Sequence, residues 1–362
     1  MSQRTPIAVL GSSGLLAGEL LRLLEGHPEL ALLAAGSREP GVPLARLHPQ
    51  LASSLETVDT GAVTDALAEA LEDAPPGAQP GAGLVLGLPH GRSAAAFEAV
   101  AGELGEAAGR LAVVDLSADH RLRDAALHER WYGGAHPDPD GALGFRYGLP
   151  ELYREELEGA LRIAAPGCFA TAMQLAVVPF ARAGVLDTGA PWILHAVTGS
   201  SGSGIAPSAG THHPHRAGNL RAYAPAGHRH EAELAQALAG LGLEAPLHFL
   251  PHSGPFTRGI HLTAALPLRG PLGAEEAHSL LAEAYAGEAF VRVLPPGGIP
   301  ELRAVVGSNR ADLAVHVRGD VLTVLCVIDN TLKGGAGQAL QALNLLLGLD
   351  ETAGLPRAGL GY

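Results

Sequence analysis

The residue with the clearest chemical potential is Cys168, which follows a Pro-Gly pair in Ala164-Ala165-Pro166-Gly167-Cys168-Phe169-Ala170-Thr171. Pro and Gly end the preceding segment, and the residues after Cys168 favour helix, so a helix should begin at or near the cysteine. Unpaired N–H groups and the positive end of the helix dipole favour a thiolate there, and a thiolate is a nucleophile. The alternative is a small buried apolar residue, which is the usual role of a free cysteine.

Two histidines stand just before a helical stretch, in Gly227-His228-Arg229-His230-Glu231. A histidine at such a boundary can serve as a general base or stabilise an oxyanion. Metal binding is a competing interpretation, because further histidines form a cluster nearby, at His212, His213 and His215. Interleaved arginines would repel a cation, and the ligand spacing is not that of a defined zinc site, so we expect no metal.

A glycine turn near the N-terminus indicates a nucleotide site. The apolar run 7–10 is followed by Gly11-Ser12-Ser13-Gly14-Leu15, a helical stretch from Glu19 to Glu25 and a second apolar run, 30–35. Strand, glycine turn, helix and strand in this order begin a doubly wound dinucleotide-binding fold. Gly11 would permit the tight turn, and Gly14 would let backbone N–H groups approach a pyrophosphate. The spacing is G-x-x-G-x-x-A rather than G-x-G-x-x-G, so a turn without a ligand is the alternative.

The residues that follow the predicted strands suggest which cofactor binds. An acidic residue after the second strand would favour NAD, whereas this chain has Ser37 and Arg38, which suit the 2′-phosphate of NADP. An ordinary surface arginine is the other interpretation. Two more apolar runs, 84–88 and 111–116, lead into loops that contain Pro89 and Ser117. Ligands of this fold bind at the carboxyl ends of strands, so both residues are candidate cofactor contacts.

Composition limits the possible classes of protein. The 362 residues suffice for two domains, and 47% of them are apolar, but no stretch has the length of a membrane span. The first residues run into a strand pattern without a signal peptide, and two cysteines, Cys168 and Cys326, make no disulfide framework. We therefore expect a soluble cytoplasmic protein. A net charge of -13 argues against nonspecific nucleic-acid binding.

The charge is unevenly distributed. The span from Thr188 through His230 contains no Asp or Glu, but it holds six histidines and three arginines, among them Arg216 and Arg221. A locally basic segment in an acidic protein suggests an anionic substrate or partner, and a solvated loop is the alternative.

The second half of the chain has a different pattern from the first. Strand-like runs occur at 193–197, 262–266, 313–317 and 322–328, with Gly319-Asp320 as a hairpin turn, and helical patterns occur at 231–241 and 274–286. This predicts an α+β domain with a mainly antiparallel sheet, after an α/β dinucleotide-binding Rossmann domain. We assign residues 1–167 and 336–362, with a helical segment at 336–347, to the NADP-binding domain, and residues 168–335 to a catalytic and dimerisation domain.

With these motifs the chain resembles the acyl-phosphate semialdehyde dehydrogenases of the N-acetyl-γ-glutamyl-phosphate reductase type. The resemblance covers essentially the whole chain and rests on several long motifs in the same order: the N-terminal glycine turn, Ser37-Arg38, Leu88-Pro89-His90-Gly91, Asp115-Leu116-Ser117-Ala118-Asp119, Tyr147-Gly148-Leu149-Pro150-Glu151, Pro166-Gly167-Cys168, Gly227-His228-Arg229-His230 with Glu233, Arg258-Gly259, and Asp329-Asn330-Thr331-Leu332-Lys333-Gly334-Gly335.

The resemblance implies roles for several residues. In that family the Pro-Gly-Cys cysteine is the nucleophile, here Cys168, and one histidine of the pair, His228 or His230, is the acid/base. An acyl phosphate would acylate the thiolate, and NADPH would reduce the thioester to a semialdehyde. The resemblance also implies that Asn330 lies near the nicotinamide carboxamide.

One motif departs from the family pattern. After the strand predicted here at 193–197, the family has Ser-Gly-x-Ser-Gly-Ala-Gly-Arg. This chain has Ser200-Ser201-Gly202-Ser203-Gly204-Ile205, with Ile205 in place of the arginine. Ser200, Ser201 and Gly202 remain candidate substrate contacts. The change favours the lysine-biosynthesis branch, whose substrate is an aminoadipyl phosphate on an acidic amino-group carrier protein. Arg216 and Arg221 would then meet that carrier.

The sequence is also compatible with three other functions. They are N-acetyl-γ-glutamyl-phosphate reduction in arginine biosynthesis, the related aspartate-semialdehyde chemistry, and an NADP-binding regulator without activity. We expect a homodimer or homotetramer, with no nucleic acid or membrane as partner.

Overall fold

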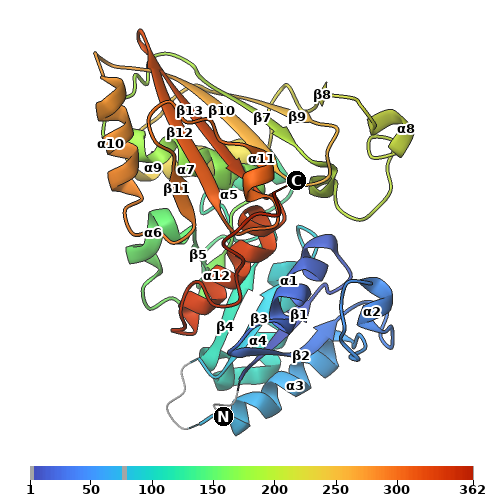
Figure 1. The fold of residues 1–362 in the computed structure, drawn as a ribbon. Coiled ribbons are helices and arrows are strands. Elements are labelled where there is room, and N and C mark those ends of the chain that lie inside the picture. The colour runs from blue at the N-terminus through green and yellow to red at the C-terminus, as the bar shows by residue number, and fades with distance from the viewer. Residues whose placement is uncertain (1–3, 76–79, 362) are drawn as a thin grey trace. The chain divides into compact units, whose positions relative to one another are not determined.

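The computed structural model describes residues 4–75 and 80–361, in two compact units (Figure 1). The first unit contains the residues up to Pro166 together with Gly335–Leu355, and the second contains Gly167–Gly334 together with the residues from Pro356 onward. Residues 336–362, predicted to belong as a whole to the first domain, are divided between the two units. The segment after Pro356 instead packs on the second unit, where the Leu360 side chain lies against Gly307 and Asn309 N donates to Pro356 O at 2.8 Å.

The first unit is built on a parallel sheet. Among the described residues its strand order is β2-β1-β3-β4-β6-β5, and every pairing is parallel. The central strands are buried and rich in Val, Leu and Ala, as a parallel sheet covered on both faces requires. The strands are β1 (Thr5–Leu10), β2 (Leu30–Gly36), β3 (Ala82–Leu86), β4 (Leu111–Asp115), β5 (Arg146–Tyr147) and β6 (Arg162–Ala164).

Helices cover both faces of this sheet. Leu84 of β3 joins a core that includes Val63 and Phe97 of α3 and α4, while the next residue back, Gly83, faces Leu343 of α12. Because neighbouring strand residues point to opposite faces, α12 covers the face opposite to α3 and α4. The helices of the unit are α1 (Leu15–Glu25), α2 (Leu44–Leu47), α3 (Thr60–Asp73), α4 (Ser93–Leu104), α5 (Ala125–Tyr132), α6 (Pro150–Leu157) and α12 (Gly337–Leu346).

The second unit contains a mixed sheet. Its strand order in the described chain is β11-β12-β13-β10-β7-β9-β8, in which β7–β9 and β11–β12 are parallel and the other pairings are antiparallel. Buried and more exposed residues alternate along β7 and β10, so one face packs inward. The strands are β7 (Trp192–Thr198), β8 (Arg221–Ala222), β9 (Leu247–Ser253), β10 (Ile260–Pro267), β11 (Val291–Val293), β12 (Ala311–Arg318) and β13 (Val321–Ile328).

The long helix α7 packs on β10 and β13, and α9 and α10 pack on α7. The hydroxyl of Tyr285, just after α10, donates to Leu175 O of α7 at 2.7 Å and fixes one of these contacts. The helices of the second unit are α7 (Cys168–Arg182), α8 (His213–Arg216), α9 (His230–Gly240), α10 (Ala274–Ala284) and α11 (Leu302–Val305).

The predicted fold class is confirmed, and the differences are local. Helix α1 begins at Leu15, directly after the glycine turn and four residues earlier than predicted, and β3 ends at Leu86. Strand β9 was missed, because His248, Pro251 and His252 interrupt its apolar pattern. None of the helices in residues 4–75 and 80–361 combines the length and the apolar character needed to cross a bilayer.

Candidate functional site

Cys168 is the first residue of α7, in the position that the Pro-Gly pair predicts. Gly167 is the N-cap, and this 15-residue helix has no side-chain cap hydrogen bond, so Cys168 stands in its first turn, at the positive end of the helix dipole. Cys168 is partly exposed, whereas Cys326 is fully buried in β13, and burial raises the pKa of the Cys326 thiol. The geometry therefore favours a thiolate at Cys168 and a thiol at Cys326.

Helix α9 brings two side chains against the residue that precedes the cysteine. Glu233 is fully buried, and its Oε2 accepts the Gly167 N–H at 3.0 Å. One turn earlier, the His230 ring lies on the Gly167 Cα, so close that a Cβ at residue 167 would stand 2.4 Å from Nε2. Gly167 must therefore be glycine, and its position fixes His230 beside the start of α7.

Gly334 approaches Cys168 from another segment of the same unit. A Cβ at residue 334 would lie 2.7 Å from the Cys168 Cβ, and Gly334 N donates to Asp329 O at 2.9 Å. This contact gives a physical reason for the Lys333-Gly334-Gly335 sequence, since a side chain at 334 would displace the cysteine.

His228 has a role distinct from that of His230. Its Nδ1 accepts the His230 backbone N–H at 3.2 Å, so the neutral ring carries its proton on Nε2. Burial, and then the nearby charge of Arg229, lower the pKa of His228 to about 4. At neutral pH His228 is therefore an uncharged ring that can donate a hydrogen bond through Nε2.

Tyr223 is a candidate site residue that the sequence analysis missed. Burial, and then the negative charge of a Cys168 thiolate, raise the pKa of its hydroxyl, which therefore stays protonated. Its ring lies 6.0 Å from that of His228. The available signal was an aromatic residue within the basic span, five positions before His228, and only the tertiary structure brings it near Cys168.

The glycine turn has the shape that a pyrophosphate requires. Gly11 has φ +84°, and a Cβ there would stand 2.5 Å from Gly87 O, so only glycine fits. Gly14 has ordinary φ, and a Cβ there would meet only Gly11 O, at 3.9 Å. Helix α1 has no side-chain cap hydrogen bond, so no cap side chain competes with a phosphate for its first N–H groups. These residues fit a dinucleotide.

The remaining predicted cofactor residues lie around this turn and at strand ends. Ser13 and Arg38 are exposed, whereas the Ser12 hydroxyl is buried and donates to Gly36 O at 3.0 Å. Ser37 Oγ accepts the Glu39 N–H at 3.2 Å. The Ser12 side chain is thus used within the turn itself, whereas the side chains of Ser13 and Arg38 are exposed.

The loops after β3 and β4 are bound to one another. Asp119 Oδ2 accepts the Ser93 N–H at 2.8 Å at the start of α4, and His90 Nδ1 accepts the Ala118 N–H at 2.9 Å. Pro89 is exposed on this edge. The Ser117 hydroxyl is buried and donates to Asp115 Oδ2 at 2.9 Å, so Ser117 shapes the loop from inside.

In the second unit, Asn330 lies beside Ser201, one of the candidate substrate contacts. Asn330 Nδ2 donates to Ser201 Oγ at 3.0 Å, and Asn330 Oδ1 accepts the Gly259 N–H at 2.7 Å. Asn330 thereby joins the loop at Ser201 to the backbone of Gly259 by hydrogen bonds. Beside them Arg258 forms an ion pair with the buried Asp329, at 2.9 Å between Nη2 and Oδ2.

The two arginines expected to meet a partner differ in structure. The Arg216 guanidinium donates to Ser253 Oγ, Gly254 O and Phe256 O, so it anchors α8 to the end of β9. Arg221 is exposed, as are His212, His213 and His215 and the apolar Ile205 and Leu220. Arg221 is therefore the arginine available to a partner.

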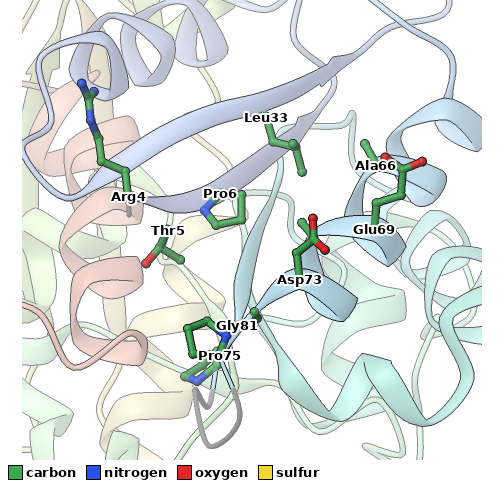
Figure 2. Close-up of a pocket in the computed structure, with 12 residues that line it drawn as sticks. Arg4, Thr5, Pro6, Leu33, Ala66, Glu69, Asp73, Pro75 and Gly81 are labelled. Atoms are coloured by element: carbon green, nitrogen blue, oxygen red, sulfur yellow. The ribbon is translucent and has the colours of Figure 1, made fainter. Parts of the chain in front are cut away.

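A cavity of about 470 Å³ lies elsewhere in the first unit (Figure 2). It is lined by Thr5 and Pro6 at the start of β1, by Gly81 before β3, and by Glu69 and Asp73 of α3. These positions are at the amino ends of the parallel strands, whereas the glycine turn follows the carboxyl end of β1. The cavity is therefore separate from the predicted cofactor site.

Comparisons with known proteins agree with this division of the chain. Residues 6–160 match the family model "Semialdehyde dehydrogenase, NAD binding domain", and residues 168–330 match "Semialdehyde dehydrogenase, dimerisation domain". A solved structure of aspartate semialdehyde dehydrogenase II from Vibrio cholerae matches with a TM-score of 0.65 at 16% identity, over 95% of this chain and 99% of that one.

Curated relatives are similar over the full length. An N-acetyl-gamma-glutamyl-phosphate reductase of Symbiobacterium thermophilum is 41% identical, over 98% of this chain and 99% of the relative. A [LysW]-L-2-aminoadipate 6-phosphate reductase of Deinococcus radiodurans is 38% identical, over 99% of each chain. Relatives with the two different names are thus similar to this chain at nearly the same sequence identity.

The glycine turn provides a matched pair of variants. Gly14→Ala should leave the thermal unfolding temperature nearly unchanged, because its φ suits alanine and its Cβ would meet only Gly11 O at an ordinary contact distance, but it should weaken dinucleotide binding at least tenfold. Gly11→Ala should destabilise the fold itself, because alanine at φ +84° would clash with Gly87 O. Calorimetric titration and thermal unfolding separate the two effects. Wild-type affinity in Gly14→Ala would contradict the placement of the pyrophosphate.

The lowered pKa of His228 predicts how stability depends on pH. Below pH 6.5 the unfolded chain binds a proton at this residue, while the folded protein resists it down to about pH 4. The contribution of His228 to the free energy of unfolding is thus fully present above pH 6.5 and is lost as pH falls toward 4. Relative to His228→Asn, the wild type should lose about 1 kcal/mol per pH unit in this window, measured by urea unfolding. A difference independent of pH would contradict the burial of His228.

Proposed function

The chain belongs to the semialdehyde dehydrogenase family, and we propose that it reduces an acyl phosphate to a semialdehyde with NADPH, through a thioester on Cys168. It is an oxidoreductase of amino-acid biosynthesis that uses a nicotinamide dinucleotide. The observation that carries the proposal is the position of Cys168 at the uncapped start of α7, with His230 and Glu233 of α9 against Gly167.

The first half of the reaction is acyl transfer. The Cys168 thiolate attacks the carbonyl carbon of the acyl phosphate, a C–S bond forms, the C–O bond to phosphate breaks, and phosphate leaves with the bonding pair. The N-terminus of α7 stabilises the thiolate before the attack, and Tyr223, which burial and the Cys168 charge keep protonated, adds no second negative charge.

The second half is reduction. When bound, the dinucleotide supplies a hydride to the thioester carbon. His230 donates a proton to the resulting oxyanion and takes it back as the C–S bond breaks, so that the aldehyde leaves and the thiolate is restored. We assign this role to His230 because its ring adjoins Gly167, whereas His228 is held neutral and positions the His230 backbone.

NADPH is the preferred form of the cofactor. Arg38 is exposed directly after β2, at the place where an acidic residue would select NAD. A structural neighbour, aspartate semialdehyde dehydrogenase of Candida albicans, was solved with NADP, and it shares the fold at a TM-score of 0.64 and 15% identity.

The preferred substrate is a 2-aminoadipyl phosphate carried by an acidic protein, in lysine biosynthesis. The relative from Deinococcus radiodurans is named for such a LysW-bound substrate. The exposed Arg221, within the acid-free span 188–230, supports docking of an acidic partner. The alternative is free N-acetyl-γ-glutamyl phosphate, in arginine biosynthesis, as other relatives are named. A regulator without activity would not need Cys168, His230 and Glu233 in this arrangement.

The enzyme is proposed to act in the cytoplasm as a homodimer or homotetramer. The family model of the second unit is described as a dimerisation domain. One face of the seven-stranded sheet in the described chain is partly exposed, with Ile193 of β7 at 45%, which supports contact with a second copy.

Cys168→Ser tests the nucleophile. The serine hydroxyl is far less ionised than the cysteine thiol at neutral pH, so the turnover number should fall by several orders of magnitude while NADPH binding is retained. Cys326→Ala is the matched control, since Cys326 is buried within β13, and it should keep most of the activity. Turnover is measured as NADPH oxidation. A Cys168→Ser variant with near-normal turnover would refute the mechanism.

Arg38→Ala tests the choice of cofactor. Loss of a charged hydrogen bond to the 2′-phosphate should raise the Michaelis constant for NADPH by roughly thirtyfold, or about 2 kcal/mol, with little change for NADH. Steady-state kinetics with both cofactors provide the comparison. Equal efficiency of the wild type with NADPH and NADH would remove the basis of the NADP assignment.

Arg221→Glu tests the carrier. With a carrier-bound substrate, activity should fall severalfold as ionic strength rises from about 0.01 to about 0.1 M, because the Debye length shortens from about 30 to about 10 Å. Arg221→Glu should lower this activity further and leave that on a free acyl phosphate unchanged. Arg269→Glu, at an exposed arginine outside the span, is the control. A flat salt profile with the carrier-bound substrate would favour the arginine-biosynthesis alternative.

A further inference from the structure

We propose that His48 is a positioning residue that fixes the glycine turn for the cofactor pyrophosphate. The proposal rests on the proposed dinucleotide site and adds a residue that lies 34 positions beyond Gly14 in the chain. His48 directly follows the short helix α2 and is 4% exposed. A buried histidine on a loop requires a partner, and its partner is the glycine turn.

The contact is a hydrogen bond to the backbone of the turn. His48 Nε2 lies 2.7 Å from Ser12 O. A carbonyl oxygen only accepts, so Nε2 carries the proton and donates it. On its other side the ring lies over the Gly18 Cα of α1, where a Cβ would stand 2.4 Å from Nδ1. Gly18 thus makes room for His48, although glycine weakens a helix interior.

The residue that carries this carbonyl is also bound to the sheet, through its side chain and the preceding peptide units. Gly36 O, at the end of β2, accepts from Gly11 N, Ser12 N and Ser12 Oγ, each at 3.0 Å. Ser12 is therefore fixed through its N–H, its hydroxyl and its carbonyl. The first two of these bonds reach β2, and the third reaches His48.

The orientation of the Ser12 carbonyl determines that of the next amide. A peptide unit is planar and trans, so the Ser13 N–H points opposite to the Ser12 carbonyl, away from His48. No acceptor for the Ser13 N–H is found among the described residues. Together with the uncapped start of α1, this N–H is available to an anionic oxygen. By holding the carbonyl, His48 keeps the N–H in position for a phosphate.

The position of His48 in the chain connects two parts of the cofactor site. Ser37 and Arg38, the candidates for the 2′-phosphate, begin the segment between β2 and α3, and His48 lies later in the same segment. This segment thus contains both Arg38, which would bind the 2′-phosphate, and His48, which holds the turn that would bind the pyrophosphate.

Binding of two ligands tests the proposal without relying on catalysis. His48→Ala should weaken NADPH binding about tenfold, the effect of one lost hydrogen bond, measured by calorimetric titration. Adenosine 2′-monophosphate, which lacks the pyrophosphate, should bind as it does to the wild type. His48→Gln, whose amide can donate to Ser12 O, should recover part of the NADPH affinity.

Gly18→Ala provides a second, coupled variant. Its methyl group should displace His48 and weaken NADPH binding to a similar extent. In the His48→Ala background the methyl group should have little further effect, because the ring that it would strike is gone.

The outcomes separate this proposal from the proposed function. Wild-type NADPH affinity in His48→Ala would overturn it, and so would equal weakening of NADPH and adenosine 2′-monophosphate, which would indicate general loss of structure. A wild-type protein that binds neither NADPH nor NADH would contradict the proposed function itself. If His48→Ala does not fold, His48→Gln and Gly18→Ala take its place. Weakened NADPH binding by His48→Gln, with normal binding of adenosine 2′-monophosphate, would support the proposal. Normal binding of both ligands by His48→Gln and by Gly18→Ala would overturn it.

Discussion

The second unit is organised around the hydrogen bond between the Gly167 N–H and the buried Glu233 carboxylate. This bond holds the start of α7 against α9, and the same approach places the His230 ring on the Gly167 Cα. A carboxylate without exposure needs strong donors, and a backbone N–H at the N-cap of a helix is one. Cys168 and His230, the proposed nucleophile and acid/base, are thus positioned by a contact in which neither side chain takes part.

Close backbone approach, permitted by glycine, recurs at each functional position. Gly167 admits His230, Gly334 admits Cys168, and Gly18 admits His48. At each of these positions a methyl group would enter the space of a side chain that the proposed chemistry or cofactor binding uses. These glycines therefore determine where the neighbouring side chains lie. A substitution at one of them should impair the proposed function by displacing that neighbour.

The sequence predicts the main architecture because its signals are local. Apolar runs bounded by glycine and proline mark β1, β2, β4, β7, β10, β12 and β13, and the Pro-Gly pair marks the start of α7. Strand β9 was missed because two histidines and a proline break its pattern, and it is stabilised by parallel pairing with β7. Tyr223 and His48 were missed because their partners, near Cys168 and at Ser12, are remote in sequence. The proposal of His230 rather than His228 as the acid/base likewise depends on the tertiary contact with Gly167, which no local pattern in the sequence shows.

The most direct test of the account is to observe the acyl-enzyme without reduction. The full-length protein is mixed with its acyl phosphate in the absence of nicotinamide cofactor, and phosphate release and intact protein mass are followed together. A thioester mechanism on Cys168 predicts a burst of one phosphate per protomer and a mass increase of one acyl group, located on Cys168 by peptide mapping. Phosphate release that requires NADPH, or an acyl group on any residue other than Cys168, would contradict it.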